Sequence, residues 1–227
     1  MNFIVTGASR GIGFESVKLL LEKGHQVITL SRSVEKLESL ANNYDTLTPI
    51  AFDLSQGNFD HLLPYFKKWK VIHGILNNAG LLINKPTEEL TDTDLTNLFN
   101  VNVIAPIKIL RIALPYMKHS ELKHVVNVSS MGGFQGSAKF SGLSAYSASK
   151  SAVACLAECW AEEYKEVGIK ANALAIGAVQ TEMLAEAFPG YEAPLSAQEM
   201  ANFMVNFLLN ESKYYNGKTL PVSLSTP

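Results

Sequence analysis

The segment SAYSASKSAV, residues 144–153, places a tyrosine four residues before a lysine. Four residues make about one helical turn, so the side chains of Tyr146 and Lys150 would project from one helix face with their functional ends close together. A free phenol has a pKa of about 10 and is a poor base at neutral pH unless nearby positive charge favours the phenolate. The spacing fits either ordinary packing or a phenol held beside an ammonium as a proton carrier.

A second candidate for chemistry is the glycine-rich segment VTGASRGIGFES near the N-terminus. Gly7, Gly11 and Gly13 fall between a short β-branched run and a helix-like segment. Glycine at such a junction permits a tight turn and lets the backbone approach a pyrophosphate, while the helix N-terminus favours the negative charge. The segment therefore predicts a phosphate-binding turn.

The same segment also fits the G-x-S-x-G pattern of a hydrolase nucleophile, with Ser9 at its centre. The order Ser9, Asp53, His124 could supply the acid and the histidine of a catalytic triad, although it would place the nucleophile after the first strand. This hydrolase hypothesis is the weaker alternative to phosphate binding.

Two further patterns carry less weight. Ser147 and Lys150 imitate an S-x-x-K nucleophile, but no companion SDN or KTG segment occurs. Cys155 and Cys159 lie four apart on one presumed helix, where thiols in a reducing compartment behave as small apolar core residues. We expect no metal site and no redox pair.

The elements that would position these residues alternate along the chain. Short β-branched runs precede longer amphipathic segments or loops into them, which predicts a parallel sheet with helices on both faces. These runs are residues 3–7, 26–31, 47–52, 71–78, 124–130 and 170–176, with a further strand in 217–222. Gly24 should cap the first helix, and Ser196 with Glu199 should form a capping box that opens a helix over 196–209. No linker or repeat interrupts the pattern, so we predict a single domain, residues 1–227.

Composition excludes several function classes. The net charge of −2 over 227 residues leaves no basic field for nucleic acid. The most apolar long window, residues 101–117, contains Lys108 and Arg111 and falls short of the roughly 18 apolar residues that a membrane span needs. The N-terminus lacks the basic region of a targeting segment, so we expect a cytoplasmic protein that contacts neither membrane nor nucleic acid.

Four ordered motifs resemble those of the short-chain dehydrogenase/reductase family, of the compact single-domain kind. They are TGASRGIG at 6–13, NNAG at 77–80, NVSS at 127–130 and YSASK at 146–150. The resemblance implies a Rossmann-type, doubly wound parallel sheet of about seven strands, with the substrate held at the carboxyl edge.

The resemblance also implies roles for four residues. Tyr146 matches the family's general acid/base, Lys150 its partner and a ligand of the nicotinamide ribose, Ser130 the residue that holds the substrate oxygen, and Asn102 a fourth member that anchors a water. Ser130 and Tyr146 are 16 residues apart, further than is usual in the family, so the loop between them should carry extra residues. Ser129 is the alternative to Ser130, but it would face the opposite side of the strand.

The end of the second presumed strand indicates the cofactor. Ser31 stands where NAD-preferring relatives carry an acidic residue, and the guanidinium groups of Arg10 and Arg32 suit a 2′-phosphate. We therefore predict NADP(H). The expected cofactor-binding residues are Gly7, Ser9, Arg10, Gly11, Ile12, Gly13, Arg32, Asp53, Leu54, Asn78, Ala79, Gly80, Tyr146, Lys150, Val179 and Thr181.

The resulting functional hypothesis is an NADPH-dependent oxidoreductase that transfers a hydride between the cofactor and a small carbonyl or alcohol substrate. A 3-oxoacyl thioester reductase is one candidate within it, and a non-catalytic NADP(H)-binding sensor is the alternative, because Ile176 replaces a proline usual in the family. The substrate cleft should be lined by Met131, Phe134, Phe140, Met183 and Phe188. The apolar segments around residues 95–117 and 149–164 predict a homodimer or homotetramer.

Overall fold

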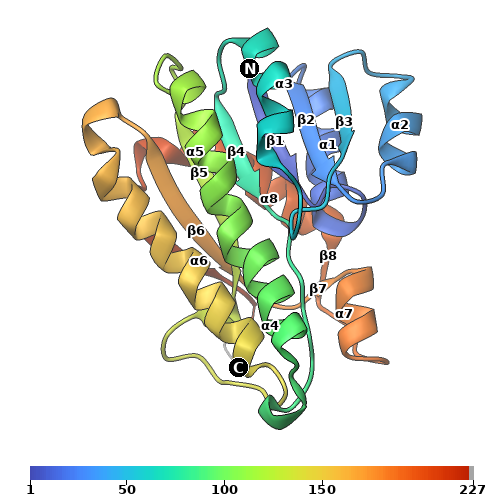
Figure 1. Cartoon of the computed structure of the whole chain (residues 1–227). Coiled ribbons are helices and arrows are strands. Elements are labelled where there is room, and N and C mark those ends of the chain that lie inside the picture. The colour runs from blue at the N-terminus through green and yellow to red at the C-terminus, as the bar shows by residue number, and fades with distance from the viewer. Residues whose placement is uncertain (225–227) are drawn as a thin grey trace.

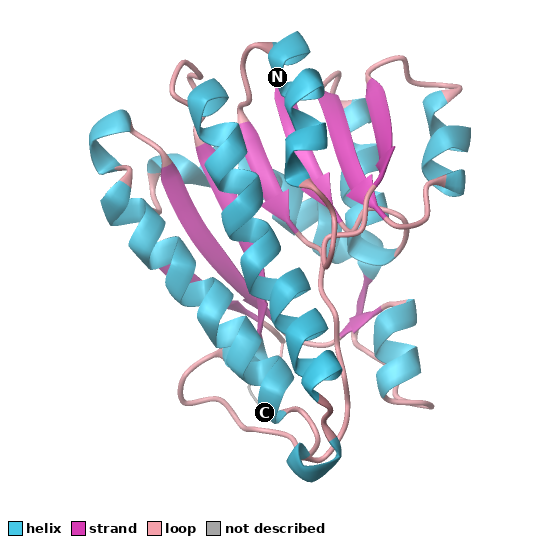
Figure 2. Ribbon diagram, viewed as in Figure 1, coloured by secondary structure: helices cyan, strands magenta, loops and turns pink. Residues whose placement is uncertain are grey.

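A seven-stranded parallel sheet forms the centre of the molecule. The computed structural model describes residues 1–224, and its strands are ordered β3-β2-β1-β4-β5-β6-β9. Every pairing in this sheet is parallel, so its strands run the same way in Figure 2. The strands are β1 Asn2–Thr6, β2 Gln26–Ser31, β3 Leu47–Ala51, β4 Gly74–Asn77, β5 His124–Ser130, β6 Lys170–Ile176 and β9 Lys218–Val222. This order confirms the predicted Rossmann-type α/β fold.

Helices cover both faces of the sheet (Figure 1). They are α1 Gly11–Glu22, α2 Glu35–Ala41, α3 Leu63–Trp69, α4 Asp92–Phe99, α5 Ala105–Met117, α6 Ser144–Glu163, α7 Glu182–Ala187 and α8 Ala197–Asn210. Short 3-10 turns occupy Phe59–Leu62, Thr87–Glu89, Met131–Gly133, Lys165–Val167 and Glu211–Lys213, and two short strands, β7 Val179–Gln180 and β8 Leu195–Ser196, pair beside the sheet. The helical layers follow from parallel strands, which need a crossover between each pair.

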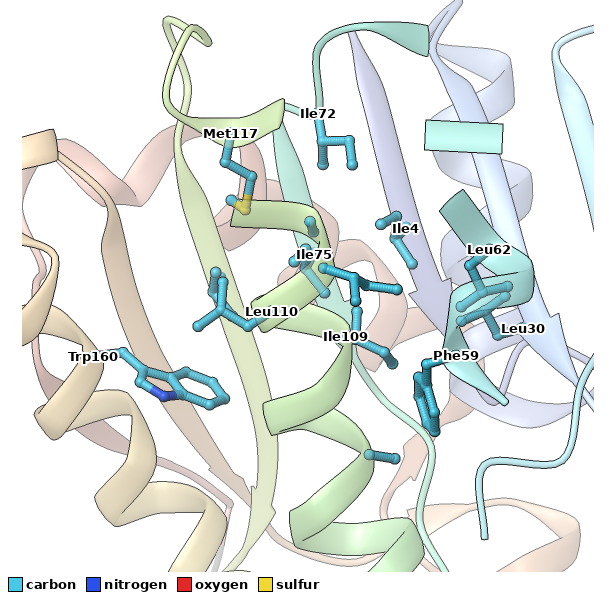
Figure 3. Close-up of a cluster of buried hydrophobic side chains, with 14 of the residues drawn as sticks. Ile4, Leu30, Phe59, Leu62, Ile72, Ile75, Ile109, Leu110, Met117 and Trp160 are labelled. Carbon is cyan, nitrogen blue, oxygen red and sulfur yellow. The ribbon is translucent and has the colours of Figure 1, made fainter. Parts of the chain in front are cut away.

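Alternation along the strands creates two separate cores. In β1, Ile4 packs with α3, α5 and α6 on one face, while Phe3 and Val5 pack with α1 and α8 on the other. Figure 3 shows the first core, where Ile109 of α5 and Trp160 of α6 reach toward the sheet. Because successive strand side chains point to opposite faces, both faces must be apolar, as the short β-branched runs predicted.

The predicted helix ends are confirmed. Gly24 adopts a left-handed conformation, φ 76°, directly after α1, and its N–H donates to Leu21 O. Ser196 and Glu199 form the capping box of α8, in which each side chain bonds the backbone N–H of the other residue. Both caps satisfy backbone groups that the helix itself leaves unpaired.

The fourth strand is shorter than predicted. It begins at Gly74 rather than at residue 71. The N–H groups of Val71 and Ile72 donate instead to the carbonyls of Trp69 and Tyr116. These β-branched residues therefore belong to the turn that enters the sheet, because their N–H groups bond helix carbonyls and not strand carbonyls.

The expectation of a buried cysteine pair is wrong. Cys155 and Cys159 are both exposed. The sheet-facing side of α6 is formed by other residues, among them Ala157 and Trp160. Spacing at four residues places the two thiols on one helix face, but it does not say which face meets the sheet.

A continuous helical run extends from Asp92 to Met117, with a π-helical turn at Asn100–Ile104 between α4 and α5. Its 26 residues include a window of mean hydropathy 1.4, so by length and composition alone this run could cross a membrane. In the fold, 44% of that window is buried. A core helix of a soluble protein meets the same criterion, and the absence of a membrane contact stays a prediction.

His124 is the centre of a buried polar network that joins β5 to β6 and α8. It is fully buried at the start of β5, and its Nδ1 lies 2.9 Å from Leu208 O, while its Nε2 lies 3.0 Å from Asn172 Nδ2. Leu208 O can only accept a hydrogen bond, and the Asn172 Nδ2 group can only donate one. The His124 ring is therefore neutral, with its proton on Nδ1. Burial lowers the pKa of His124 to about 4, because the charged form would lose its hydration.

This network predicts acid sensitivity of the fold. In the unfolded state the histidine has a pKa of about 6.5, and folding lowers this pKa to about 4. The contribution of neutral His124 to the free energy of unfolding is therefore complete above about pH 6.5 and is lost as the pH falls toward about 4. The loss should approach roughly 3 kcal/mol. Urea unfolding from pH 7 to pH 4 should show a shallower pH dependence for His124→Gln than for the wild type.

The control for this measurement is His119→Gln, which removes an exposed histidine. Its curve should parallel that of the wild type. If the His124→Gln curve is also parallel, the buried histidine does not govern the acid sensitivity.

Candidate active site

A large cleft lies at the carboxyl edge of the sheet. In Figure 1, α7 stands beside these strand ends. The volume of the cleft is about 1010 Å³. The walls come from the turn after β1, the ends of β2 and β3, the segment after β4, the first turn of α6 and the segment before α7. Parallel strands bring these separate segments to one edge, which is where doubly wound folds hold ligands.

The turn after β1 lies directly against the segment after β4. Gly7 has φ 66°, and a Cβ atom there would lie 2.6 Å from Ala79 Cα. A Cβ at Gly13 would overlap the carbonyl oxygen of Gly7. Only glycine fits both positions, so the backbone N–H groups at the start of α1 are open to a phosphate, and the residues fit a dinucleotide.

Polar side chains hold this turn in place. Asn78 Nδ2 donates to the carbonyls of Thr6 and Gly7, and the N–H of Ala79 donates to Thr6 Oγ1. The buried Ser31 hydroxyl accepts from the N–H of Ala8 at 2.9 Å. Ser31, which was expected to leave room for a 2′-phosphate, thus also positions the glycine turn. Its place at a strand end did not predict this second role.

The far end of the cleft carries the residues expected beside the adenosine. Asp53 Oδ1 accepts from the backbone N–H and the hydroxyl of Ser55, at 2.8 and 2.6 Å. These bonds, together with the nearby Arg32 guanidinium, lower the pKa of Asp53, which stays ionised at neutral pH. Ser33 and Lys36 also line the cleft here. They were missed in the sequence, although both closely follow Arg32 at the start of α2.

The other end of the cleft gathers Tyr146 and Lys150 from α6 with Ser130 from the end of β5. The Ser130 hydroxyl lies beside the Tyr146 phenol and favours its ionised form. Lys150 Nζ lies 5.8 Å from the centroid of the Tyr146 ring and donates to Val128 O at 2.8 Å. The Ser129 hydroxyl donates instead to Lys150 O, so Ser130 and not Ser129 points toward the tyrosine.

Burial shifts the two titrating groups of this end in opposite directions. It raises the pKa of the Tyr146 phenol, an effect that the nearby Ser130 hydroxyl partly offsets. It lowers the pKa of the Lys150 ammonium to about 8, because a charged form loses hydration in the interior. At neutral pH the phenol is therefore protonated and the lysine is still mainly charged.

Asn102 lies within the π-helical turn and is buried. Its Oδ1 accepts from the N–H of Leu81, and its Nδ2 donates to Leu81 O and to the hydroxyl of Ser149. The Ser149 hydroxyl in turn donates to Tyr146 O. The amide joins the segment after β4 to α6, and Ser149 is a further member of the network that sequence reasoning missed.

The loop after Ser130 lies flat on α6. A Cβ at Gly133 would be 2.6 Å from the N of Ser151, and the Ser151 hydroxyl donates to Gly133 O. The Ser130 hydroxyl also accepts from the N–H of Gly132 at 3.2 Å. The glycine pair lets this loop, longer than the family's usual one, leave the strand without disturbing the serine.

The replacement of proline by Ile176 leaves an ordered turn. The N–H of Gly177 donates to Val222 O at 2.9 Å, and Ile176 pairs with Val222 in the β6–β9 ladder. Thr181 caps α7 by accepting from the N–H of Leu184. Pairing with β9 thus holds the end of β6 in place up to this turn.

Most of the predicted site residues line the cleft, but not all. Those that do are Gly7, Ser9, Arg10, Gly11, Ile12, Arg32, Asp53, Leu54, Asn78, Ala79, Gly80, Tyr146, Lys150 and Thr181. Gly13, Asn102, Ser130 and Val179 are absent from the lining. Of the apolar residues expected to line the substrate end, only Met183 does so, together with Leu81, Ile83 and Ile176, which were not anticipated.

The hydrolase triad does not form. Ser9 follows the carboxyl end of β1, whereas His124 opens β5 at the opposite edge of a parallel sheet. Both ring nitrogens of His124 are already engaged there. Among residues 1–224, no group of three histidine, cysteine or acidic side chains is placed to hold a metal ion.

The fold and the glycine turn define a Rossmann-type dinucleotide-binding protein. A model of the short chain dehydrogenase family matches residues 2–192. This chain therefore belongs to the short chain dehydrogenase family, whose members are oxidoreductases that use a nicotinamide cofactor on small-molecule substrates.

Individual similar proteins differ in their cofactors. L-xylulose reductase of Caenorhabditis elegans is 29% identical over 239 residues, covering 96% of this chain and 92% of that protein. A 4-hydroxyisoleucine dehydrogenase mutant complexed with NADH and succinate has a TM-score of 0.86 at 22% identity, covering 98% of this chain and 97% of the other. A structure described as a short chain dehydrogenase from Escherichia coli CFT073 complexed with NADPH has a TM-score of 0.85 at 26% identity, covering 97% and 95%.

The contact between Gly7 and Ala79 predicts a steep cost of substitution. Gly7→Ala should combine the left-handed backbone cost of about 1–2 kcal/mol with a backbone clash, whereas Gly24→Ala, at φ 76° with nothing within 4 Å of its Cβ position, should show the backbone cost alone. Urea unfolding of both variants measures the difference. Equal losses of stability would show that the close approach of the two segments carries no energetic constraint.

Proposed function

We propose that this protein is an NADPH-dependent carbonyl reductase that transfers a hydride between NADP(H) and a small carbonyl or alcohol substrate, with Tyr146 as the general acid/base. The observation that carries the proposal is the meeting of Tyr146 with Ser130 at one end of the cleft, with the Lys150 ammonium 5.8 Å from the centre of the Tyr146 ring. A packing tyrosine would need neither the serine nor the buried ammonium.

The bound nicotinamide would supply the hydride, and the protein's own residues would manage the proton and the oxygen. Ser130 donates a hydrogen bond to the substrate oxygen, and Tyr146 donates its proton to the same oxygen as negative charge develops there. The raised pKa of Tyr146 keeps the phenol protonated at neutral pH, which suits the reducing direction. The charge on Lys150 stabilises the phenolate that remains.

Asn102 has a positioning role in this proposal. Its side-chain amide is occupied by Leu81 and Ser149, so it holds the segment after β4 against the helix that carries Tyr146. The family resemblance assigned it a water, and that assignment stays a prediction.

The preference for NADPH rests on charge at the adenosine end. Arg10, Arg32 and Lys36 line the cleft there, and the strand end carries Ser31 in place of an acidic residue. Glu35 also lines the cleft, so the site is not uniformly basic. Guanidinium groups bind phosphate in two-point contacts, which favours a 2′-phosphate over a 2′-hydroxyl.

Two narrower hypotheses follow from the same residues. A cofactor-binding sensor without chemistry is the alternative that Ile176 suggested; the β6–β9 pairing beside Ile176 supports the enzyme hypothesis over it. A 3-oxoacyl thioester reductase is one example of the carbonyl class. A carbonyl screen with the Tyr146 variant below separates an enzyme from a sensor.

A homodimer or homotetramer stays a prediction. Ile104 of the π-helical turn is 37% exposed, and α6 presents the exposed Cys155 and Cys159. These surfaces would suit a second copy of the chain. Localisation in the cytoplasm likewise stays a prediction.

Tyr146→Phe tests the chemistry. The variant keeps the ring but has no proton to transfer, so turnover in a carbonyl screen should fall about 10²- to 10⁴-fold while NADPH binding stays nearly intact. Tyr164→Phe, at the other end of α6, is the matched control. Undiminished turnover of Tyr146→Phe would remove the proposed mechanism.

Arg32→Ala tests the cofactor preference. Titration of the purified protein with NADPH and NADH, followed by the fluorescence of the reduced nicotinamide, should show tighter binding of NADPH. Losing one charge-assisted contact should weaken NADPH binding about tenfold or more and leave NADH binding almost unchanged. Arg111→Ala, an exposed arginine on α5, controls for net charge; a parallel loss for both cofactors in Arg32→Ala would contradict the assignment.

A further inference from the structure

An ion pair joins the phosphate turn to the helix that follows β7. Glu186 belongs to α7, and its carboxylate accepts from both terminal nitrogens of Arg10, at 2.5 Å from Nη1 and 3.2 Å from Nη2. The two residues are 176 positions apart in sequence. The contact therefore depends on where α7 docks beside the cleft, and neither residue predicts the other.

Arg10 is also a wall residue of the cofactor cleft. It lines both the large cleft and a neighbouring cavity of about 520 Å³, as do Lys36 and Glu182. The two nitrogens that bind Glu186 are the paired donors that a guanidinium offers to a phosphate. A carboxylate and a phosphate cannot both occupy this edge of Arg10.

The acidic side of α7 adds to this competition. Glu182 also acts electrostatically on Arg10, and its carboxylate lies near the start of α1. The pairing lowers the pKa of Glu186, which is therefore charged at neutral pH. The positive charge of Arg10 therefore faces two carboxylates of α7, Glu182 and Glu186.

We propose that Glu186 is a specificity-determining residue, which competes with the 2′-phosphate of NADP(H) for Arg10 and so moderates the preference for NADP(H) over NAD(H). The inference rests on the proposed NADPH-dependent function. NAD(H) has no 2′-phosphate, so its binding does not require Arg10 to leave Glu186. The side chains of Arg10 and Glu186 are 42% and 62% exposed, so the pair is screened by water and the competition is modest.

Glu186→Gln isolates this effect. The Kd for NADPH, measured by nicotinamide fluorescence, should fall about threefold to tenfold, while the Kd for NADH should stay unchanged. Glu192→Gln, an exposed carboxylate in the segment after α7, makes the same change in net charge and should have no effect. In an Arg10→Ala background, the effect of Glu186→Gln should disappear.

Adenosine 2′,5′-bisphosphate and 5′-AMP serve as probes that lack the nicotinamide. Calorimetry should show that Glu186→Gln tightens binding of the first and not of the second. If Glu186→Gln weakens the binding of NADPH and NADH alike, Glu186 instead holds α7 over either cofactor. If the binding of all four ligands is unchanged, Glu186 has no role in cofactor binding. Either result overturns the proposal.

These outcomes are distinct from failure of the proposed function. If the wild type prefers NADPH and Glu186→Gln changes nothing, only the role of Glu186 fails. If the wild type prefers NADH but Glu186→Gln selectively gains affinity for NADPH, the cofactor assignment fails and the competition stands. If the wild type binds neither cofactor, both fail.

Discussion

The attachment of α6 to the end of β5 is the contact on which the site depends. Lys150 reaches across to Val128 O, and the Ser129 hydroxyl returns a bond to Lys150 O. Both bonds are buried, where an unpaired polar group is costly, so they fix the helix against the strand. Because Tyr146 lies one turn before Lys150 and Ser130 follows Ser129, the Tyr146 phenol and the Ser130 hydroxyl come together as a consequence.

The phosphate side of the cleft depends on a different constraint, the near contact of two backbones. Glycine at positions 7 and 13 brings the start of α1 against the segment after β4, and Asn78 and Ser31 hold that geometry. The cofactor would then span both ends of one edge. Charge at this edge is balanced and not simply positive, since acidic residues of α7 approach the same turn that carries Arg10.

Local patterns predicted the elements well where one interaction decides the outcome. The capping box at Ser196 and the glycine cap at Gly24 are short-range hydrogen-bonding devices, and both formed as predicted. The fourth strand was overextended because β-branched residues near 71 suit a strand but bond helix carbonyls here. The cysteines were misplaced because four-residue spacing defines a shared face without identifying its neighbour.

The sequence by itself determined the alternation of strands and helices, the glycine turn and the one-turn separation of Tyr146 from Lys150, because each depends on spacing along the chain. Only the tertiary structure decided that Asn102 bonds Leu81 and Ser149, and that Glu186 occupies Arg10. These contacts join segments distant in the chain. Which residues meet depends on how the helical layers pack against the sheet, and residue types and spacing along the chain do not determine it.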